Sequence, residues 1–222
     1  MTRVLYVHGL ESGPTGHKVR LLQEAGFEVR SVQMPCSRRH SLRDGLFVGW
    51  VAALGVALVA AALSPLPALA LVVPAVGAAS FPLVKALVTR RVFARSLEVQ
   101  RPQLQAHAID VVVGSSFGGA IAVELISRGL WSGPAVLLCP AHALVARRSR
   151  RPPHPGFAGV PSAVLERIVV VHGTRDETVP LEDSQRLVAQ TPARLITVED
   201  DHRLSATATA ASLKAWVTAA LP

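Results

Sequence analysis

A serine flanked by glycines follows a short apolar run near the middle of the chain. Residues 111–119 read Val-Val-Val-Gly-Ser-Ser-Phe-Gly-Gly, and a helix-forming run begins at Ala120. The Gly-x-Ser-x-Gly spacing is typical of a sharp turn from strand to helix that exposes a serine hydroxyl above a sheet. Gly114 and Gly118 leave room for backbone that must pass close to this turn. The pattern predicts Ser116 as a nucleophile, and a glycine-rich turn without chemistry is the alternative.

A serine hydroxyl needs a general base and an orienting acid to react near neutral pH. Two polar motifs follow later apolar runs: His-Gly-Thr-Arg-Asp at 172–176 and Glu-Asp-Asp-His at 199–202. We interpret Asp176 as the acid and His202 as the base, with Glu177 and Asp200 as alternative acids. A turn aspartate and a surface histidine are the non-catalytic interpretations of these two residues.

Acyl transfer also needs backbone N–H groups that bind a developing oxyanion. The N–H of Phe117 begins the helix that follows the serine, so it is the first candidate. The loop after the first strand offers the N–H of Leu10, with Glu11 as the alternative donor. This loop lacks the Gly-Lys-Ser/Thr ending of a phosphate-binding loop, which argues against a nucleotide site.

Short apolar runs alternate with helical patterns along most of the chain. We expect strands at residues 3–7, 27–33, 109–113, 135–139, 167–171 and 194–198, and helices near 18–25, 120–128, 181–190 and 205–221. This alternation predicts an α/β fold with a mostly parallel, doubly wound sheet. Functional residues in such folds lie at the carboxyl ends of the strands, where the candidate residues above fall.

One long stretch departs from this alternation, because residues 45–84 contain no charged side chain. Residues 46–63 are all apolar or glycine, and a helix of that length is roughly 27 Å long, close to the thickness of a bilayer core. Ser64 and Pro65 break it, and residues 66–84 form a second apolar stretch interrupted by prolines. We predict an inserted helical hairpin over residues 45–95, with a catalytic domain formed by 1–44 and 96–222.

Positive charge flanks the hairpin on both sides. The flanking basic residues are Arg38, Arg39, Arg43, Lys85, Arg90, Arg91 and Arg95. The positive-inside rule then puts both ends, and the catalytic domain, on the cytoplasmic side of a membrane. The alternatives are a buried helical pair or an apolar lid over the site.

A further basic run at 147–151 is either a solvated loop or a contact for anionic lipid headgroups.

The motifs together resemble a known family. The segments 6–18, 113–119 and 172–180 and the pair Asp201-His202 are similar to the small YqiA-type serine esterases of the alpha/beta-hydrolase superfamily. The resemblance covers about 1–43 and 96–222, and implies that Ser116, Asp176 and His202 act as nucleophile, acid and base. In similar proteins, the segment before the strand that leads to the nucleophile looks like one short helix. Here that helix would run from residues 41–44 directly into 97–100, so the insertion divides it.

Composition limits the remaining classes. The chain has 222 residues, a net charge of +8 and 5% aromatic residues, and no nucleic-acid-binding motif stands out. Its two cysteines form no CxxC pair, which favours a reducing compartment, and the early strand pattern argues against a signal peptide. We find no metal or cofactor motif and expect neither.

The expected function is a membrane-associated serine hydrolase that cleaves carboxylic esters or thioesters of small or lipid-like molecules through an acyl-enzyme. The alternatives are a non-catalytic, membrane-anchored binding module on the same fold and a soluble lipase with an apolar lid.

Overall fold

The computed structural model describes residues 1–10 and 12–222. In this part of the chain six strands form one fully parallel sheet in the order β2-β1-β3-β4-β5-β6. The strands are β1 (Arg3–Val7), β2 (Glu28–Arg30), β3 (Val111–Ser115), β4 (Ala135–Leu138), β5 (Ile168–Gly173) and β6 (Arg194–Val198). The sheet confirms the doubly wound class. Its order changes direction between β1 and β3, the point at which such folds bind ligands.

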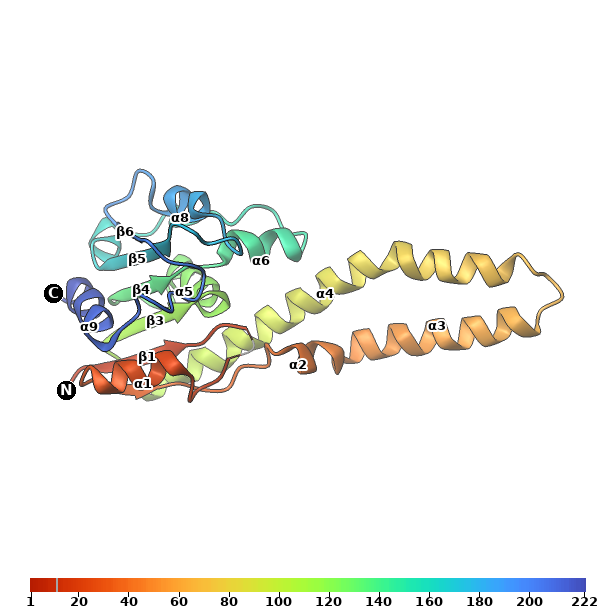
Figure 1. Ribbon diagram of the computed structural model, residues 1–222, viewed down its shortest axis with the longest axis horizontal. Coiled ribbons are helices and arrows are strands. Elements are labelled where there is room, and N and C mark those ends of the chain that lie inside the picture. Colours follow the sequence, from red (N-terminus) through yellow and green to blue (C-terminus); the bar gives the residue numbers. More distant parts are fainter. Residues whose placement is uncertain (11) are drawn as a thin grey trace.

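Helices cover both faces of the sheet (Figure 1). They are α1 (His17–Glu24), α2 (Arg38–Leu42), α3 (Gly45–Leu63), α4 (Leu69–Ala106), α5 (Phe117–Ser127), α6 (His142–Arg148), α7 (Ser162–Leu165), α8 (Leu181–Val188) and α9 (Ala210–Ala220). One apolar cluster joins the sheet to α1 and α9, and a second joins it to α4, α5 and α8.

The two clusters follow from the alternation of side chains along each strand. In β1, Val4 and Tyr6 belong to the cluster with α1 and α9, whereas Leu5 and Val7 belong to the cluster with α4 and α5. All four side chains are buried. A strand that is apolar on both faces must lie inside a doubly covered sheet, which explains the continuous apolar run.

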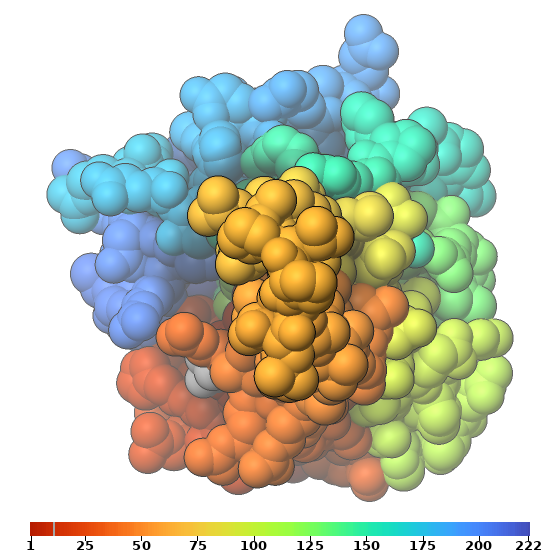
Figure 2. All heavy atoms as spheres, turned by 90° about the vertical axis from the view of Figure 1, so that its right-hand side faces the viewer, coloured from red at the N-terminus to blue at the C-terminus, as the bar shows by residue number. Residues whose placement is uncertain are grey.

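Helix α3 and the first half of α4 form a hairpin that projects away from the sheet (Figure 1), and Figure 2 views the molecule from the hairpin's side. The two helices are joined near their base, where Trp50 Nε1 donates to Ser80 Oγ at 3.0 Å. Farther out, a Cβ added at Gly77 would lie 3.1 Å from the Leu54 side chain, so glycine allows the helices to approach closely. The expected helical hairpin is therefore present.

Asp44 fixes the hairpin to the domain. Its carboxylate accepts the Leu46 N–H at 3.0 Å and so caps α3. The same buried carboxylate pairs with Arg95 at 3.0 Å and Arg91 at 3.5 Å on α4. One residue therefore begins the first helix and binds it to the second.

The structure differs from the sequence-based elements in several places. Strand β2 is shorter than 27–33, α9 begins at Ala210 rather than near 205, and α2, α6 and α7 were not expected. Helix α4 is continuous through Pro74, Pro82 and Pro102, and extends past residue 95. Its last part packs into the core through Val92, Phe93 and Leu97, so it supplies the helix that we expected at 97–100.

Candidate active site

Ser116 lies at the turn between β3 and α5 in a strained conformation, with φ 54° and ψ −114°. A non-glycine residue adopts a positive φ only where the surroundings enforce it. Here Ser116 N–H donates to Leu138 O at 2.8 Å, and Ser116 O accepts from Ala141 N–H at 3.0 Å. The turn is thus held against β4 on both sides of the serine.

The glycines of the motif are required by close backbone approach. A Cβ added at Gly118 would lie 1.9 Å from Val7 O, and one added at Gly114 would lie 2.7 Å from Gly118 O. Neither position has room for a larger residue. Both glycines are therefore needed to let neighbouring backbone pass close to the turn, as expected from the sequence.

The three candidate residues meet at the carboxyl edge of the sheet. Ser116 Oγ lies 2.7 Å from His202 Nε2, and His202 Nδ1 lies 2.6 Å from Asp176 Oδ2. A carboxylate only accepts, so Nδ1 carries the proton and donates to it, which leaves Nε2 to accept from the serine hydroxyl. Both hydrogen bonds expected of a nucleophile, base and acid are present.

The Asp176 side chain is fully buried and heavily bonded. Its Oδ1 accepts from Thr178 N–H and Val179 N–H, both at 2.8 Å, and its Oδ2 also lies 3.3 Å from His172 Nε2. Burial alone would raise the pKa of Asp176, but the hydrogen bonds from His172, His202 and Val179 outweigh it and hold the pKa well below the usual range. Asp176 is therefore charged when His202 needs a partner.

The alternative acids lie elsewhere. Glu177 is exposed. Asp200 is buried and accepts from Ala206 N–H, Thr207 N–H and Thr207 Oγ1, so it fixes the loop that carries His202. Across residues 1–10 and 12–222, neither carboxylate hydrogen-bonds to His202.

The two candidate oxyanion donors also lie near the serine. Gly9 is so close that an added Cβ would lie 3.4 Å from Ser116 Cβ. Its carbonyl accepts from His8 Nδ1 and Ser12 Oγ, both at 2.9 Å, which turns the N–H of the same peptide, that of Leu10, in the opposite direction. Among the described residues, no hydrogen-bond acceptor contacts the N–H of Leu10 or Phe117. The alternative donor, Glu11, lies outside the described residues.

Three residues for which no role was expected from the sequence support the site. His8 positions the Gly9 carbonyl, and burial lowers its pKa, which keeps it neutral. His172 Nε2 lies 3.3 Å from Asp176 Oδ2, the oxygen that also binds His202, and the His172 ring is itself held by Ser184 Oγ at 2.7 Å. Cys139, at the end of β4, is buried beside the acid with a positive φ of 44°. None of these roles has a local sequence signal, because each depends on contacts between distant loops.

Cys139, Asp176 and His202 could also be considered as metal ligands, since one donor atom from each lies within 4.8 Å of the others. A cysteine binds a metal ion through its deprotonated thiolate. Burial raises the pKa of Cys139 to about 12. A metal would also have to replace the bond between His202 and Asp176. The donor set therefore fits a proton relay better than a metal site.

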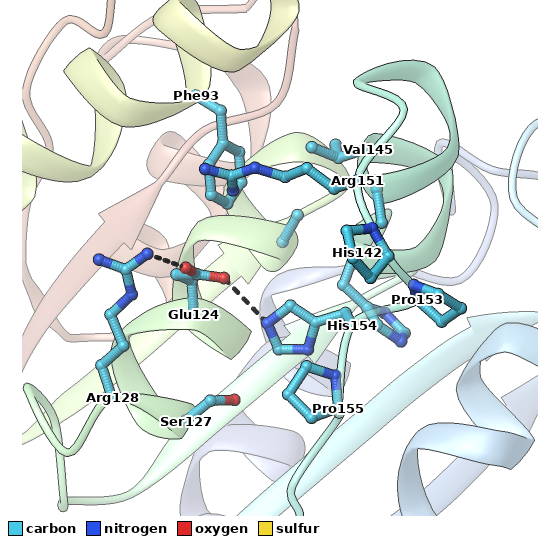
Figure 3. A pocket seen from close by; sticks show the side chains of 13 residues that line it. Phe93, Glu124, Ser127, Arg128, His142, Val145, Arg151, Pro153, His154 and Pro155 are labelled. Atoms are coloured by element: carbon cyan, nitrogen blue, oxygen red, sulfur yellow. Dashed lines mark hydrogen bonds and ion pairs between the residues drawn. The ribbon is translucent and has the colours of Figure 1, made fainter.

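A pocket of about 390 Å³ lies between α4, α5, α6 and residues 151–155 (Figure 3). Glu124 at its wall is paired with Arg128 and with His154 Nε2, the latter at 2.9 Å. Hydrogen bonding from His154, against the effect of burial, lowers the pKa of Glu124. Among the described residues, no member of the Ser116, His202 and Asp176 group lines this pocket. No motif in the sequence predicts this pocket.

Known proteins share this fold. No protein-family model and no curated protein sequence matches the chain. The solved structure of a hydrolase assigned to the alpha/beta superfamily from Xanthomonas campestris pv. campestris is 24% identical with a TM-score of 0.53, over 96% of this chain and 95% of that one. Est1E from Butyrivibrio proteoclasticus is 14% identical (TM-score 0.53; 99% and 88% covered). Dienelactone hydrolase from Anabaena variabilis is 13% identical (TM-score 0.54; 100% and 87% covered).

Proposed function

We propose that this chain, which has the alpha/beta-hydrolase fold, is a membrane-associated serine hydrolase that cleaves carboxylic esters or thioesters. One observation carries the proposal: Ser116 Oγ, His202 and Asp176 form a continuous hydrogen-bonded chain at 2.7 and 2.6 Å. The strained turn at Ser116 presents the hydroxyl to that chain. The narrower likeness to YqiA-type esterases stays a prediction.

The geometry supports an acyl-enzyme mechanism. His202 Nε2 takes the proton of Ser116 Oγ while that oxygen attacks the ester carbonyl carbon. The C=O π electrons move to the carbonyl oxygen. The tetrahedral intermediate then re-forms the carbonyl and expels the alcohol or thiol, which His202 protonates. Water next attacks the acyl-enzyme by the same route and regenerates Ser116. Asp176 stabilises the imidazolium that forms in both halves of the reaction.

The oxyanion would bind to the N–H groups of Phe117 and Leu10. Phe117 is the first residue of α5, so the positive end of that helix adds to the attraction for negative charge. Gly9 brings the Leu10 peptide next to Ser116. Loss of one such donor costs about 10²–10³ in rate in known enzymes.

Ester turnover by purified protein tests the assignment. With a soluble short-chain p-nitrophenyl ester, we expect Ser116→Ala to lose at least about 10⁴ in kcat. Ser115→Ala is the matched control, because Ser115 is adjacent but buried in β3. Normal turnover by Ser116→Ala would refute the proposed nucleophile. A folded protein without turnover on esters or thioesters would favour a binding module instead.

Several properties of the hairpin support membrane insertion. Helix α3 has 19 residues, which corresponds to roughly 28 Å, about the thickness of a bilayer core. Only 6% of the apolar stretch of α3 is buried in the protein. Val56, Leu63 and Leu71 are 71%, 82% and 78% exposed, so water would contact a long apolar surface in a soluble protein. We propose that residues 45–95 are an inserted unit whose outer apolar part enters the bilayer, while its last residues, such as Val92 and Phe93, pack into the core of the domain.

The basic residues on both flanks support a cytoplasmic position for the catalytic domain, which we predict to be formed by 1–44 and 96–222. We expect the full chain to stay with membranes after carbonate extraction. Release into the soluble fraction would instead support an apolar lid, although in this structure the hairpin extends away from the sheet (Figure 1).

A further inference from the structure

The hairpin leaves the domain on the side where the catalytic residues lie. Ser116 and Asp176 follow the carboxyl ends of β3 and β5, and His202 follows β6. The strands run toward the end of the domain from which the α3–α4 hairpin projects (Figure 1). If the hairpin enters a bilayer, the carboxyl edge of the sheet must face that bilayer.

The base of the hairpin is strongly basic. Arg39 and Arg43 precede α3, and Lys85, Arg91 and Arg95 lie on α4; all are exposed. Asp44 is the one acidic residue in the sequence between residues 38 and 95. It is buried and bound to Arg91 and Arg95. The exposed charge at the hairpin base is therefore entirely positive.

A second basic segment is hydrogen-bonded to α4 at the foot of the hairpin. Arg90 on α4 donates from Nε to Ser149 O at 2.7 Å and from a terminal nitrogen to Arg150 O at 2.8 Å. Next to them, the Arg151 guanidinium lies 5.8 Å from the centre of the Phe93 ring. In Figure 2, α6 and the loop after it lie next to α4. Segments that are far apart in sequence thus form one basic patch: Arg39, Arg43, Lys85, Arg90, Arg91, Arg95, Arg148, Arg150 and Arg151.

Arg90, which joins the two segments of the patch, lies within electrostatic reach of a membrane surface. Lys85 is the first charged residue after the uncharged stretch 45–84, so it marks the level of the headgroups. Arg90 lies five residues further along α4, roughly 7.5 Å along the helix axis. The screening length in 0.1 M salt is about 10 Å. Because α4 connects the patch to the apolar hairpin, a bilayer is its natural partner.

We propose that this basic patch binds anionic lipid headgroups and holds the carboxyl edge of the sheet against the bilayer, so that the substrate is an ester presented at an anionic membrane surface. This inference rests on the proposed hydrolase activity and names the source of its substrate. Arg148 and Arg150 are free of ion pairs among the described residues and exposed. Arg147, by contrast, is already paired with Asp183 at 2.9 Å. Within this loop, we therefore expect Arg148 and Arg150 to contribute most to the binding of anionic headgroups.

The test uses the full chain reconstituted into vesicles of phosphatidylcholine alone, or with a third of phosphatidylglycerol. Turnover of a long-chain p-nitrophenyl ester dissolved in the bilayer is divided by turnover of a soluble short-chain ester. We expect anionic lipid to raise this ratio several-fold in the wild type. Each lost arginine should reduce the ratio of docked to undocked protein by about five-fold. The double variant Arg148→Gln/Arg150→Gln should therefore lose most of the response.

The double variant Arg20→Gln/Lys214→Gln is the matched control, because it removes the same charge from exposed positions on α1 and α9. We expect it to respond as the wild type does. In the wild type, 1 M salt should abolish the response, because the screening length falls to about 3 Å. Equal ratios in both vesicle types, or an unchanged response in Arg148→Gln/Arg150→Gln, would overturn the inference while the hydrolase assignment stands. No turnover of either ester would refute the hydrolase assignment and this inference with it.

Discussion

Replacement of Asp176 by asparagine should disable the site through the tautomer of His202. Oδ1 of Asp176 already accepts two backbone N–H groups, from Thr178 and Val179. The oxygen of an asparagine would stay there, so its NH₂ group would face His202 Nδ1 in place of Oδ2. Nδ1 must then accept, which moves the ring proton to Nε2. A protonated Nε2 cannot take the proton of Ser116.

The size of the effect follows from this loss of the base. A histidine held in the wrong tautomer typically costs about 10⁴ in kcat, or about 5.5 kcal/mol of transition-state stabilisation. KM should change little, because the Asp176 side chain is fully buried and does not reach a substrate. The NH₂ group would also point toward His172 Nε2, so the free energy of unfolding should fall by about 1–3 kcal/mol.

The assay is kcat for a soluble ester, with thermal unfolding to show that the variants are folded. Asp200→Asn and Glu177→Gln are matched controls: Asp200 is two residues before His202 and Glu177 follows Asp176, and neither carboxylate bonds to the His202 ring in the described structure. Asp200→Asn should lower the melting temperature and Glu177→Gln should do little, while both keep kcat within about ten-fold. Asp176 does not orient His202 as described if Asp176→Asn keeps kcat within ten-fold, or if either control loses as much activity.

Three further predictions test other parts of the structure. Burial lowers the pKa of His142 from 6.5 to about 4. As the pH falls, the unfolded chain protonates this histidine before the folded protein does, so the free energy of unfolding should fall by up to about 3 kcal/mol between pH 6.5 and 4. An equal decline in His142→Gln would contradict this. Gly118→Ala should cost more than about 3 kcal/mol in thermal unfolding, because its Cβ would meet Val7 O at 1.9 Å, whereas Gly45→Ala, with nothing within 4 Å, should be near neutral. Val56→Arg should weaken carbonate-resistant membrane retention by placing a charge worth about 3 kcal/mol near the middle of the apolar span, and full retention would argue against insertion.

Much of the catalytic domain could be predicted from the sequence because local patterns and topology agree. The apolar runs within β1, β3 and β5 are buried on both faces, so these strands are encoded in a few consecutive residues. In a parallel sheet all carboxyl ends lie on one edge, which is why Ser116, Asp176 and His202 could be expected to meet although they are far apart in the chain.

The parts that could not be predicted depend on tertiary contacts. Prolines usually mark helix boundaries, but α4 continues through Pro82 because the residues that follow, such as Val84 and Val88, pack into the core. The bonds from Arg90 to the loop after α6 join segments about 60 residues apart and leave no sequence pattern. Cys139 likewise comes close to Asp176 only because β4 and β5 are neighbours.

Covalent labelling of Ser116 is the most direct test of the central claim. A fluorophosphonate reacts only with a serine activated by a neighbouring base, and mass spectrometry of the digested protein identifies the residue that carries the label. We expect one labelled residue, Ser116, in the wild type and in Ser115→Ala, and no label in His202→Ala. Folded wild-type protein that stays unlabelled, or that carries the label on another serine, would contradict the proposed nucleophile.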